Sequence, residues 1–508
     1  MTQLALATPH ALSTSAGVEA FRRGGNALDA ALAAAASLTV TLPDNCALGG
    51  DLIAIVRRPD GDVSVINASG PAAADVEVEG LRERHGLTMP AFSADTVTVP
   101  GLLDGWETIW RLGAERPWEA IFGAATEQAC EGVPVAESVA TALDRYSARL
   151  RSDPGMSHVF FASGRALGVG ETLVQRELAS TLEHVAEAGA RAFYEGEIGR
   201  TWLEAVIERG SALSPDDLAG FETEVAEPLV GAHAGQQVFA APPNSQGALL
   251  LKTLAMVRDE ELDPLSEDAP RFAAAFEAAT DARAQYLADP RVVEVPLDLL
   301  LGVEDRPTSS PHRPARDGSG DTVALVAADQ KGWAISLIQS LFDSFGCGIL
   351  DPHTGIIAHN RGSFFSLDPT SLNVLAPGKR PVHTLSPALV QEEGRLQNVL
   401  GTMGGLAQTQ ILTHVLMHLR RGGGVAEAVG APRWTLGAIE AQGDSAAIQA
   451  EADVPQQAID ALRAGGWSIT RIPARSLDVG DAAAICRDDA GELSAAADPR
   501  GPGSAVVC

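Results

Sequence analysis

Thr322 is a hydroxyl residue at the point where a flexible segment gives way to a strand. Residues 304–320 are rich in Pro, Ser and Arg, and they end in small residues. An apolar, β-branched run begins at Thr322, and after a turn at residues 329–332 a second such run reaches Ser340. A hydroxyl at this boundary becomes a new N-terminus if the chain cuts itself between Asp321 and Thr322. The pattern alone also fits a linker before the first strand of a second domain.

An N-terminal threonine carries its own catalytic base. A threonine hydroxyl is a poor nucleophile unless a base takes its proton, and the free α-amino group of the same residue can do so. The pKa of a free α-amino group is about 8, which suits a base that works near neutral pH. A cut before Thr322 would supply that amine, so the expected chemistry is acyl transfer through an ester on Thr322.

The glycine pair Gly404-Gly405 is a second feature that fits acyl transfer. It lies between a strand predicted for residues 396–402 and a helix predicted for residues 408–420. Consecutive glycines before a helix direct unpaired N–H groups at whatever sits there, and the helix dipole adds positive potential. Such N–H groups can form an oxyanion hole. The alternative is a tight turn that needs two small residues.

The elements that must position these residues predict a layered α+β fold. Asn26 is a good N-cap for a buried helix over residues 27–40, and further helices are predicted over residues 117–130 and 172–189. Strand patterns dominate the chain after Thr322. Since both halves supply strands and helices, we expect two antiparallel sheets between two helical layers, a four-layer αββα sandwich.

Composition narrows the class of protein. The 508 residues carry a formal charge of −29, which disfavours binding to a nucleic-acid backbone. The five cysteines are widely spaced, which predicts neither a disulfide framework nor a metal-ligand cluster. No basic N-terminal region precedes an apolar run, and the apolar stretch 30–42 is too short to span a bilayer. We therefore expect a cytoplasmic protein with no membrane partner.

Short motifs along nearly the whole chain resemble, in family order, the gamma-glutamyltransferase (glutathione hydrolase) family of N-terminal nucleophile hydrolases. They are residues 23–31 (RGGNALDAA), 47–51 (ALGGD), 99–101 (VPG), 242–247 (PPNSQG), 346–349 (GCGI), 377–381 (PGKRP) and 401–405 (GTMGG). Each motif alone is a weak signal, and all of them in this order identify the chain as a member of the family.

The resemblance implies the αββα sandwich and a zymogen that cuts itself into two subunits. On this basis the large subunit is 1–321 and the small subunit is 322–508, with Thr322 as the catalytic nucleophile. Ser340 falls where the family has a threonine that hydrogen-bonds the nucleophile's amine, and Gly404 and Gly405 fall on the oxyanion-hole glycines. No metal or organic cofactor is implied, and dimerisation of the subunit pair is left open.

Four departures from the family pattern bear on the substrate. Gamma-glutamyltransferases hold the glutamate α-carboxylate with an arginine, and residues 67–72, the corresponding region here, contain no arginine. They hold the α-amino group with an aspartate, and residues 360–365 contain no aspartate. His383-Thr384 replaces a serine pair, and Phe342 replaces an asparagine. Because a buried charge needs a partner, these changes argue against a glutamate zwitterion as the acyl group.

The variant pattern looks closer to the subgroup that contains oxamate amidohydrolase. The residues that carry this likeness are Ile338-Gln339-Ser340, Asn360-Arg361-Gly362 and Val382-His383-Thr384. The resulting hypothesis is a small, oxamate-like acidic amide whose carboxylate meets Arg361 or His383, with Thr384 beside them. Arg361 as a structural donor to loop carbonyls, and His383 as a packing residue, are the alternatives.

Two alternatives for the whole chain stay open. One is a true gamma-glutamyltransferase or glutathione hydrolase with rearranged carboxylate contacts. The other is a relative that no longer cuts and serves as a binding or structural protein. The intact Asp321-Thr322 and Gly404-Gly405 favour an enzyme that hydrolyses a small amide, or transfers its acyl group to an acceptor amine.

Overall fold

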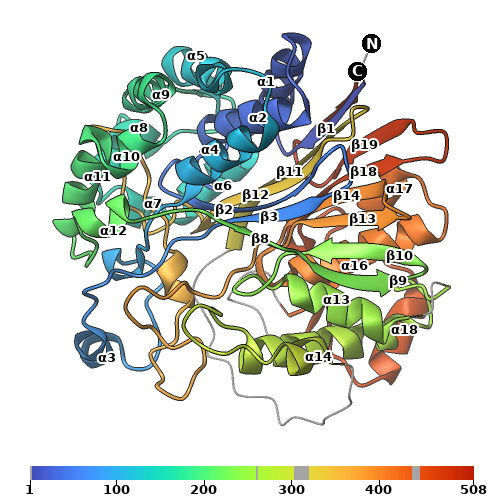
Figure 1. The fold of residues 1–508 in the computed structure, drawn as a ribbon. Helices are drawn as coiled ribbons and strands as arrows, with labels where there is room; N and C mark the ends of the chain where they lie inside the picture. The colour runs from blue at the N-terminus through green and yellow to red at the C-terminus, as the bar shows by residue number, and fades with distance from the viewer. Residues whose placement is uncertain (1–2, 259–260, 303–319, 438–446) are drawn as a thin grey trace.

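Two antiparallel sheets lie face to face between layers of helices in the computed structural model, which describes residues 3–258, 261–302, 320–437 and 447–508 (Figure 1). The first sheet has seven strands in the order β20-β1-β11-β12-β2-β3-β8, and the second has six in the order β19-β18-β14-β13-β10-β9. The chain therefore has the expected αββα sandwich.

Both sheets contain strands from before and after Thr322. The first sheet consists of β1 (Leu4–Thr8), β2 (Asp51–Arg57), β3 (Val63–Ala68), β8 (Glu224–Ala226), β11 (Gly320–Asp329), β12 (Ala334–Asp343) and β20 (Ser504–Val507). The second consists of β9 (Leu229–His233), β10 (Gln236–Ala240), β13 (Ala388–Glu392), β14 (Arg395–Met403), β18 (Asp481–Arg487) and β19 (Leu493–Ala497). The two predicted subunits would therefore be interleaved in each sheet.

The alternation of side chains along β2 shows how the layers are held together. Successive residues of a strand point to opposite faces of the sheet. Ile53 and Ile55 join an apolar cluster between the two sheets, together with Val399 of β14. Leu52 and Val56 belong instead to the cluster under the helices. A strand that is apolar on both faces is what a central strand covered on both sides requires.

Helices cover the outer face of each sheet (Figure 1). The first sheet is covered chiefly by α1 (Ala11–Arg22), α2 (Ala27–Thr41) and α4 (Leu102–Gly113), with α5 (Gly123–Glu131) and α9 (Arg176–Ala188) packed outside them. The second is covered by α13 (Gly247–Met256), α16 (Gln408–Arg420) and α17 (Val425–Gly430), with α14 (Ala269–Tyr286) packed against α13.

The start of α2 follows from its sequence. The Asn26 side chain accepts a hydrogen bond from the Leu28 N–H at 2.8 Å, and the Asp29 side chain accepts one from the Asn26 N–H at 2.8 Å. These two bonds form a capping box and satisfy N–H groups that the first helical turn leaves unpaired. The predicted cap and helix are confirmed.

Two predicted helices are shorter than expected. Residues 117–130 form a short 3₁₀ turn, η2 (Trp118–Ile121), followed by α5, and the turn brings the rings of Trp118 and Phe122 to 5.0 Å. The helix expected over residues 172–189 begins only at Arg176, because Thr172 and Leu173 pair with a strand at residues 133–134. At Thr172 and Leu173, pairing with the strand at residues 133–134 overrides local helix propensity.

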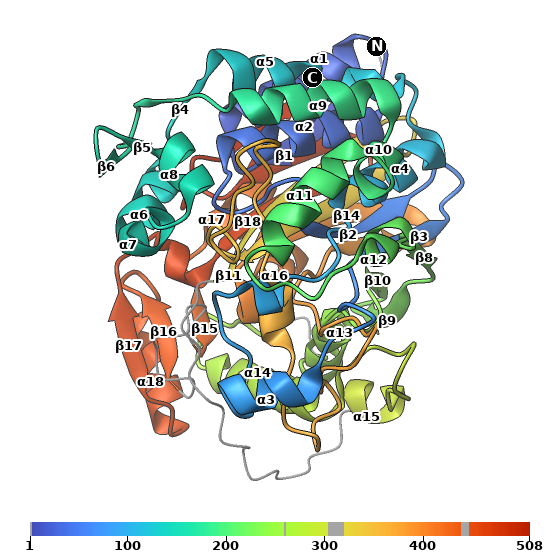
Figure 2. The ribbon, with the colours of Figure 1, turned by 90° about the vertical axis from the view of Figure 1, so that its left-hand side faces the viewer.

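A small three-stranded sheet lies at one side of the sandwich (Figure 2). It consists of β15 (Trp434–Leu436), β16 (Ile448–Glu451) and β17 (Ile469–Ile472), and α18 (Gln456–Ala464) packs on it. Trp434 joins it to the main body through ring contacts with Phe276 of α14 and His414 of α16. In the part of the chain that the structure describes, no helix combines the length and the apolar character needed to cross a bilayer.

Candidate active site

Three neighbouring strands of the first sheet bring Thr322, Ser340 and Asp51 to one end of the sandwich. Ser340 of β12 and Asp51 of β2 are direct cross-strand partners. By strand alternation, Thr322 shares a face with Ala324, and Asp51 shares a face with Ile53. Ala324 and Ile53 belong to the cluster between the sheets. The polar row therefore caps the apolar core between the two sheets.

A β-bulge sets the contact between Thr322 and Ser340. In the ladder of β11 and β12, Asp321 pairs with Phe342 and Val323 pairs with Gln339. Thr322 therefore lies opposite two residues of β12 instead of one. Bulges re-aim side chains and recur next to active sites. Here the Thr322 hydroxyl lies 3.2 Å from the Ser340 hydroxyl, which also accepts a hydrogen bond from the Phe342 N–H at 2.7 Å.

Thr322 is enclosed in the uncut chain. Its exposed fraction is 2%, and its nitrogen is part of the peptide bond to Asp321 within β11. The strand thus begins at Gly320, before the position that the sequence pattern suggested. The division into subunits and the cleavage site stay predictions.

The glycine pair follows the end of β14. Gly404 and Gly405 have φ angles of 138° and 50°, a region that favours glycine, and η4 (Gly405–Ala407) leads directly into α16. Strand β11 contacts both β14 and η4. The hydrogen bonds among the described residues include none donated by the N–H of Gly404 or Gly405. Two N–H groups are thus available at the positive end of a helix dipole.

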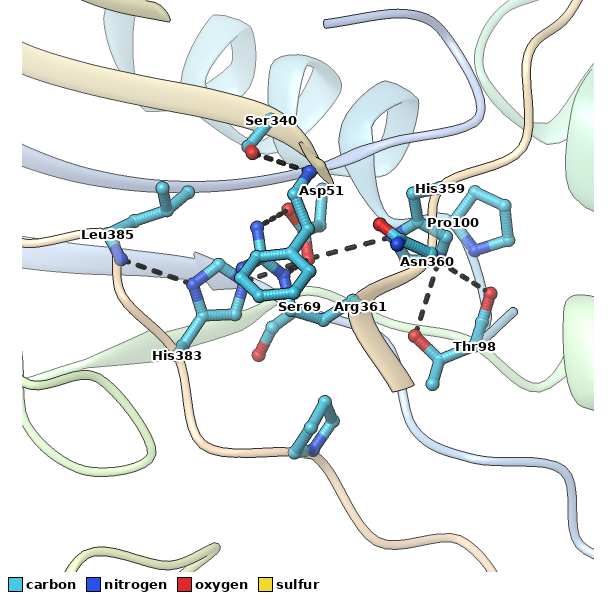
Figure 3. A network of polar contacts seen from close by, with 12 residues as sticks. Asp51, Ser69, Thr98, Pro100, Ser340, His359, Asn360, Arg361, His383 and Leu385 are labelled. Atoms are coloured by element: carbon cyan, nitrogen blue, oxygen red, sulfur yellow. Dashed lines mark hydrogen bonds and ion pairs between the residues drawn. The ribbon is translucent and has the colours of Figure 1, made fainter. Parts of the chain in front are cut away.

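Asp51, a member of this polar row, forms a buried ion pair with Arg361 (Figure 3). Arg361 Nε and Nη2 donate to the two carboxylate oxygens of Asp51, at 2.9 and 3.1 Å. The Phe342 ring lies 4.7 Å from the guanidinium carbon. Burial would raise the pKa of Asp51, but the nearby Arg361 and His383 hold it well below its usual range. Asp51 is therefore an anion throughout the neutral range.

His383 is the second partner of Asp51. Its Nε2 donates to Asp51 Oδ2 at 2.8 Å, and its Nδ1 accepts from the Leu385 N–H at 3.3 Å, which describes a neutral imidazole. Burial, together with the positive charge of Arg361, lowers the pKa of His383 to about 4. His359 lies further off, with its Nδ1 3.8 Å from Asp51 Oδ2 and its Nε2 bonded to the Thr98 carbonyl.

The loop of residues 242–247 holds the segment that carries His383 and Thr384. The His383 N–H donates to the Asn244 carbonyl at 2.8 Å, and the Gln246 side chain donates to the Thr384 carbonyl at 2.8 Å. Arg361 Nη1 faces the Thr384 hydroxyl at 3.4 Å. The three predicted substrate contacts, Arg361, His383 and Thr384, thus lie in one cluster, and their roles toward a substrate stay predictions.

Comparison with known proteins gives the family. The sequence profile of gamma-glutamyltranspeptidase matches residues 13–508. The chain belongs to the gamma-glutamyltranspeptidase family. Its members are N-terminal nucleophile hydrolases and acyltransferases, so the chain is an enzyme of this class.

Individual members of the family are similar over almost their whole length. The chain is 31% identical to the glutathione hydrolase-like YwrD proenzyme of Bacillus subtilis, covering 99% of this chain and 98% of that protein. It is 32% identical to the oxamate amidohydrolase proenzyme of Klebsiella pneumoniae, covering 98% and 97%. The crystal structure of cephalosporin acylase from Bacillus halodurans superposes with a TM-score of 0.89, at 29% identity, covering 99% and 96%.

The residue that sequence reasoning missed is Asp51. Asp51 ends the motif at residues 47–51, whose glycines serve close packing: a Cβ on Gly50 would lie 2.5 Å from the Ser340 carbonyl. The signal that could have found Asp51 is a carboxylate directly before five apolar residues, Leu52 to Val56, that are suited to burial. Such a charge requires a cationic partner elsewhere in the chain.

Cys347 takes no part in this cluster. Burial raises the pKa of its thiol to about 12, and its sulfur donates to the Ala358 carbonyl at 3.3 Å. It is a packed residue.

Proposed function

We propose that this family member activates itself by cutting the peptide bond between Asp321 and Thr322. The Thr322 hydroxyl oxygen attacks the Asp321 carbonyl carbon, the C–N bond breaks as the nitrogen takes a proton, and an ester links the two residues. Water then hydrolyses the ester, which frees the Asp321 carboxylate and the Thr322 hydroxyl and amine. The products are subunits 1–321 and 322–508.

In the mature enzyme the same oxygen attacks the substrate amide. The Thr322 amine accepts the hydroxyl proton and later delivers it to the leaving amine. The N–H groups of Gly404 and Gly405 stabilise the oxyanion, and Ser340 positions the amine. Water, or an acceptor amine, resolves the acyl-enzyme ester and restores Thr322.

The observation that carries the proposal is the 3.2 Å contact between the hydroxyls of Thr322 and Ser340 at the β12 bulge. The proposal is supported by the position of this contact at the end of the inter-sheet core, since β11, which carries Thr322, also contacts the glycine turn. The word proenzyme in the names of the similar proteins supports self-activation.

For the substrate we propose a small amide with an acidic acyl group. Asp51 accepts from Nε and Nη2 of Arg361, and Nη1 donates to the Thr384 hydroxyl, so these bonds leave the hydroxyl proton and the second Nη1 proton for a substrate. Two donors 3.4 Å apart suit a carboxylate, which accepts two parallel hydrogen bonds. His383 donates a hydrogen bond from its Nε2–H to Asp51 and so supports the cluster. The oxamate amidohydrolase among the similar proteins has the same substrate class in its name.

Glutathione hydrolysis is the second candidate, favoured by the name of the YwrD relative. Residues 67–72, where gamma-glutamyltransferases have an arginine, present only neutral groups here. The side chains of Asn67 and Ser69 are bonded to each other and to the Asn244 side chain at 2.7 to 3.1 Å. That arrangement offers no cation to a glutamate α-carboxylate.

Intact-mass measurement of the purified chain beside a Thr322→Ala variant tests the nucleophile. We expect two fragments that divide before Thr322 from the wild type and one uncut chain from the variant. A panel of oxamate, neutral amides of similar size and a gamma-glutamyl anilide then separates the two substrate classes. One uncut chain from both proteins after long incubation would exclude the proposed enzyme and leave a binding or structural relative.

A further inference from the structure

Gln246 joins three segments around the glycine turn. It lies at the end of the 242–247 loop, just before α13, and is fully buried. Its Nε2 donates to the carbonyl of Thr384 at 2.8 Å and to that of Gly405 at 3.0 Å. Its Oε1 accepts from Arg283 Nη1, on α14, at 3.0 Å. Both donor hydrogens of the amide are used, and its oxygen is held by a cation.

Arg283 fixes which way round the amide lies. A guanidinium only donates hydrogen bonds, so the atom that faces it must be the amide oxygen. The amide nitrogen is then directed at the two carbonyls, which only accept. Arg283 Nη1 also donates to the Leu406 carbonyl at 3.2 Å.

The glycine turn needs such support from outside itself. Glycine loses more conformational freedom on folding than any other residue, and two in sequence give a turn with no side chains to hold it. Within the turn, the Ala407 N–H donates to the Gly404 carbonyl at 2.9 Å. Gln246 and Arg283 hold the next two carbonyls, those of Gly405 and Leu406. The Gly404 carbonyl shares its planar peptide unit with the Gly405 N–H, and the Gly405 carbonyl belongs to the unit on the other side of the same residue. Holding both carbonyls therefore restricts the rotation of Gly405 and the direction of its N–H.

We propose that Gln246 is a positioning residue for the oxyanion hole, oriented by Arg283 and acting through the Gly405 carbonyl. This inference rests on the proposed function, since it assigns Gln246 to the N–H groups of Gly404 and Gly405. Preorganised donors are effective because they cost no rearrangement when charge develops. Loss of Gln246 therefore slows the chemical step. Its bond to Thr384 is to the backbone carbonyl and not to the hydroxyl proposed to meet the substrate, so ground-state binding should change little.

The test compares Gln246→Met, Gln246→Glu and a matched control, Gln410→Met, in the full chain. Gln410 is a buried glutamine of α16 whose side chain makes two hydrogen bonds to the Leu436 backbone, away from the turn. Removing an oxyanion donor outright costs about 100- to 1,000-fold in rate. For loss of a residue that positions the donors we expect about a 10- to 100-fold fall in the self-cleavage rate and in kcat for oxamate. KM stays within about twofold for the Met variant, and the control keeps wild-type values.

The glutamate variant separates positioning from packing. The glutamate side chain has nearly the shape of glutamine but no donor for the Gly405 and Thr384 carbonyls. The self-cleavage rate and kcat of this variant should therefore fall at least as far as those of the Met variant. Wild-type self-cleavage and kcat in Gln246→Met, or a KM that rises as much as kcat falls, would overturn the inference. If Gln246→Met fails to fold, as judged by its melting temperature, Arg283→Met tests the same support, because it removes the partner of the Gln246 amide oxygen and the donor to the Leu406 carbonyl. A wild type that neither cuts nor hydrolyses would instead overturn the proposed function.

Discussion

The carboxylate of Asp51 and the guanidinium of Arg361 lie against each other in two hydrogen bonds of 2.9 and 3.1 Å, and neither side chain reaches solvent. The two residues are 310 positions apart in the chain. Each charge is buried only because the other is present, since either one alone would bear an uncompensated desolvation cost. The pair therefore ties the start of β2 to η3 (Arg361–Phe364), beside the proposed nucleophile.

A double-mutant cycle on this pair should show strong coupling. In a Thr322→Ala background, which removes self-cleavage, we expect Asp51→Asn and Arg361→Met each to lower the free energy of unfolding by about 3–5 kcal/mol. The double variant should lose far less than the sum of these two values, because it leaves no unpaired buried charge. Denaturant unfolding measures the free energy of unfolding of the two single variants and the double variant.

The exposed pair of Arg23 and Glu19 is the control for that cycle. Its coupling should be below about 1 kcal/mol, as for other surface pairs. Strictly additive losses at Asp51 and Arg361 would contradict a mutually dependent pair.

Ser340 should matter to catalysis beyond its contribution to packing. Ser340→Ala removes the hydroxyl that lies 3.2 Å from Thr322 Oγ1. We expect self-cleavage and amide hydrolysis to fall by about 10- to 100-fold, since the amine and hydroxyl of Thr322 would lose their positioning partner. Ser340→Thr keeps a hydroxyl and should retain most activity. Ser336→Ala, on the same strand, removes a buried hydroxyl bonded to the Leu400 carbonyl and should leave both rates unchanged. Equal losses of rate in the two serine variants would argue against a specific role for Ser340.

The sequence predicted the parts of the site that depend on neighbours along the chain. The Asn26 cap, the helix that begins at Gln408 and the positive-φ turn at Gly404 and Gly405 all follow from residues within one or two turns of each other. The partners of Asp51 could not be predicted in this way, because the contact with His383 joins residues 332 positions apart. Local patterns carry no information about which distant cation meets a buried carboxylate.

The bulge at Thr322 was also beyond local reasoning. The sequence shows two strand-like runs, but the register shift beside Thr322 is set by how β11 and β12 pair, and by Phe342 at a φ of 81°. A positive φ at a phenylalanine is strained, and it holds only because the surrounding structure fixes it. Thr322 is thus predicted as the nucleophile from its chemistry and family likeness, while the direction of its side chain depends on tertiary structure.

Asp44 should make stability depend on pH. It is buried in the turn after α2, and among the described residues its Oδ1 has no hydrogen-bond partner. Burial raises its pKa to about 7. A raised pKa gives a contribution to stability that is fully present below the unfolded pKa of about 4 and is lost as pH rises through the folded pKa.

The consequence is a stabilising substitution whose benefit grows with pH. Asp44→Asn cannot ionise, so in the Thr322→Ala background its advantage over Asp44 should increase from pH 5 to pH 8.5, by about 3 kcal/mol. Chemical unfolding at the two pH values measures this. Asp60→Asn, at an exposed hairpin turn, should show no such trend. An advantage of Asp44→Asn that stays constant with pH would mean that Asp44 ionises as freely as in the unfolded chain.

Thr384 offers a direct test of the substrate class. If its hydroxyl and Arg361 Nη1, 3.4 Å apart, together receive a carboxylate, Thr384→Val removes one donor to a charged group. A lost hydrogen bond of this kind costs about 1.5–3 kcal/mol, so KM for oxamate should rise by about 10- to 100-fold with kcat nearly unchanged. A neutral amide of the same size should keep its KM. Thr413→Val, which removes a buried hydroxyl bonded within α16, controls for lost packing. A KM for oxamate that stays at the wild-type value in Thr384→Val would remove Thr384 from the acyl pocket, and an equal rise for both amides would show that the residue shapes the pocket without recognising charge.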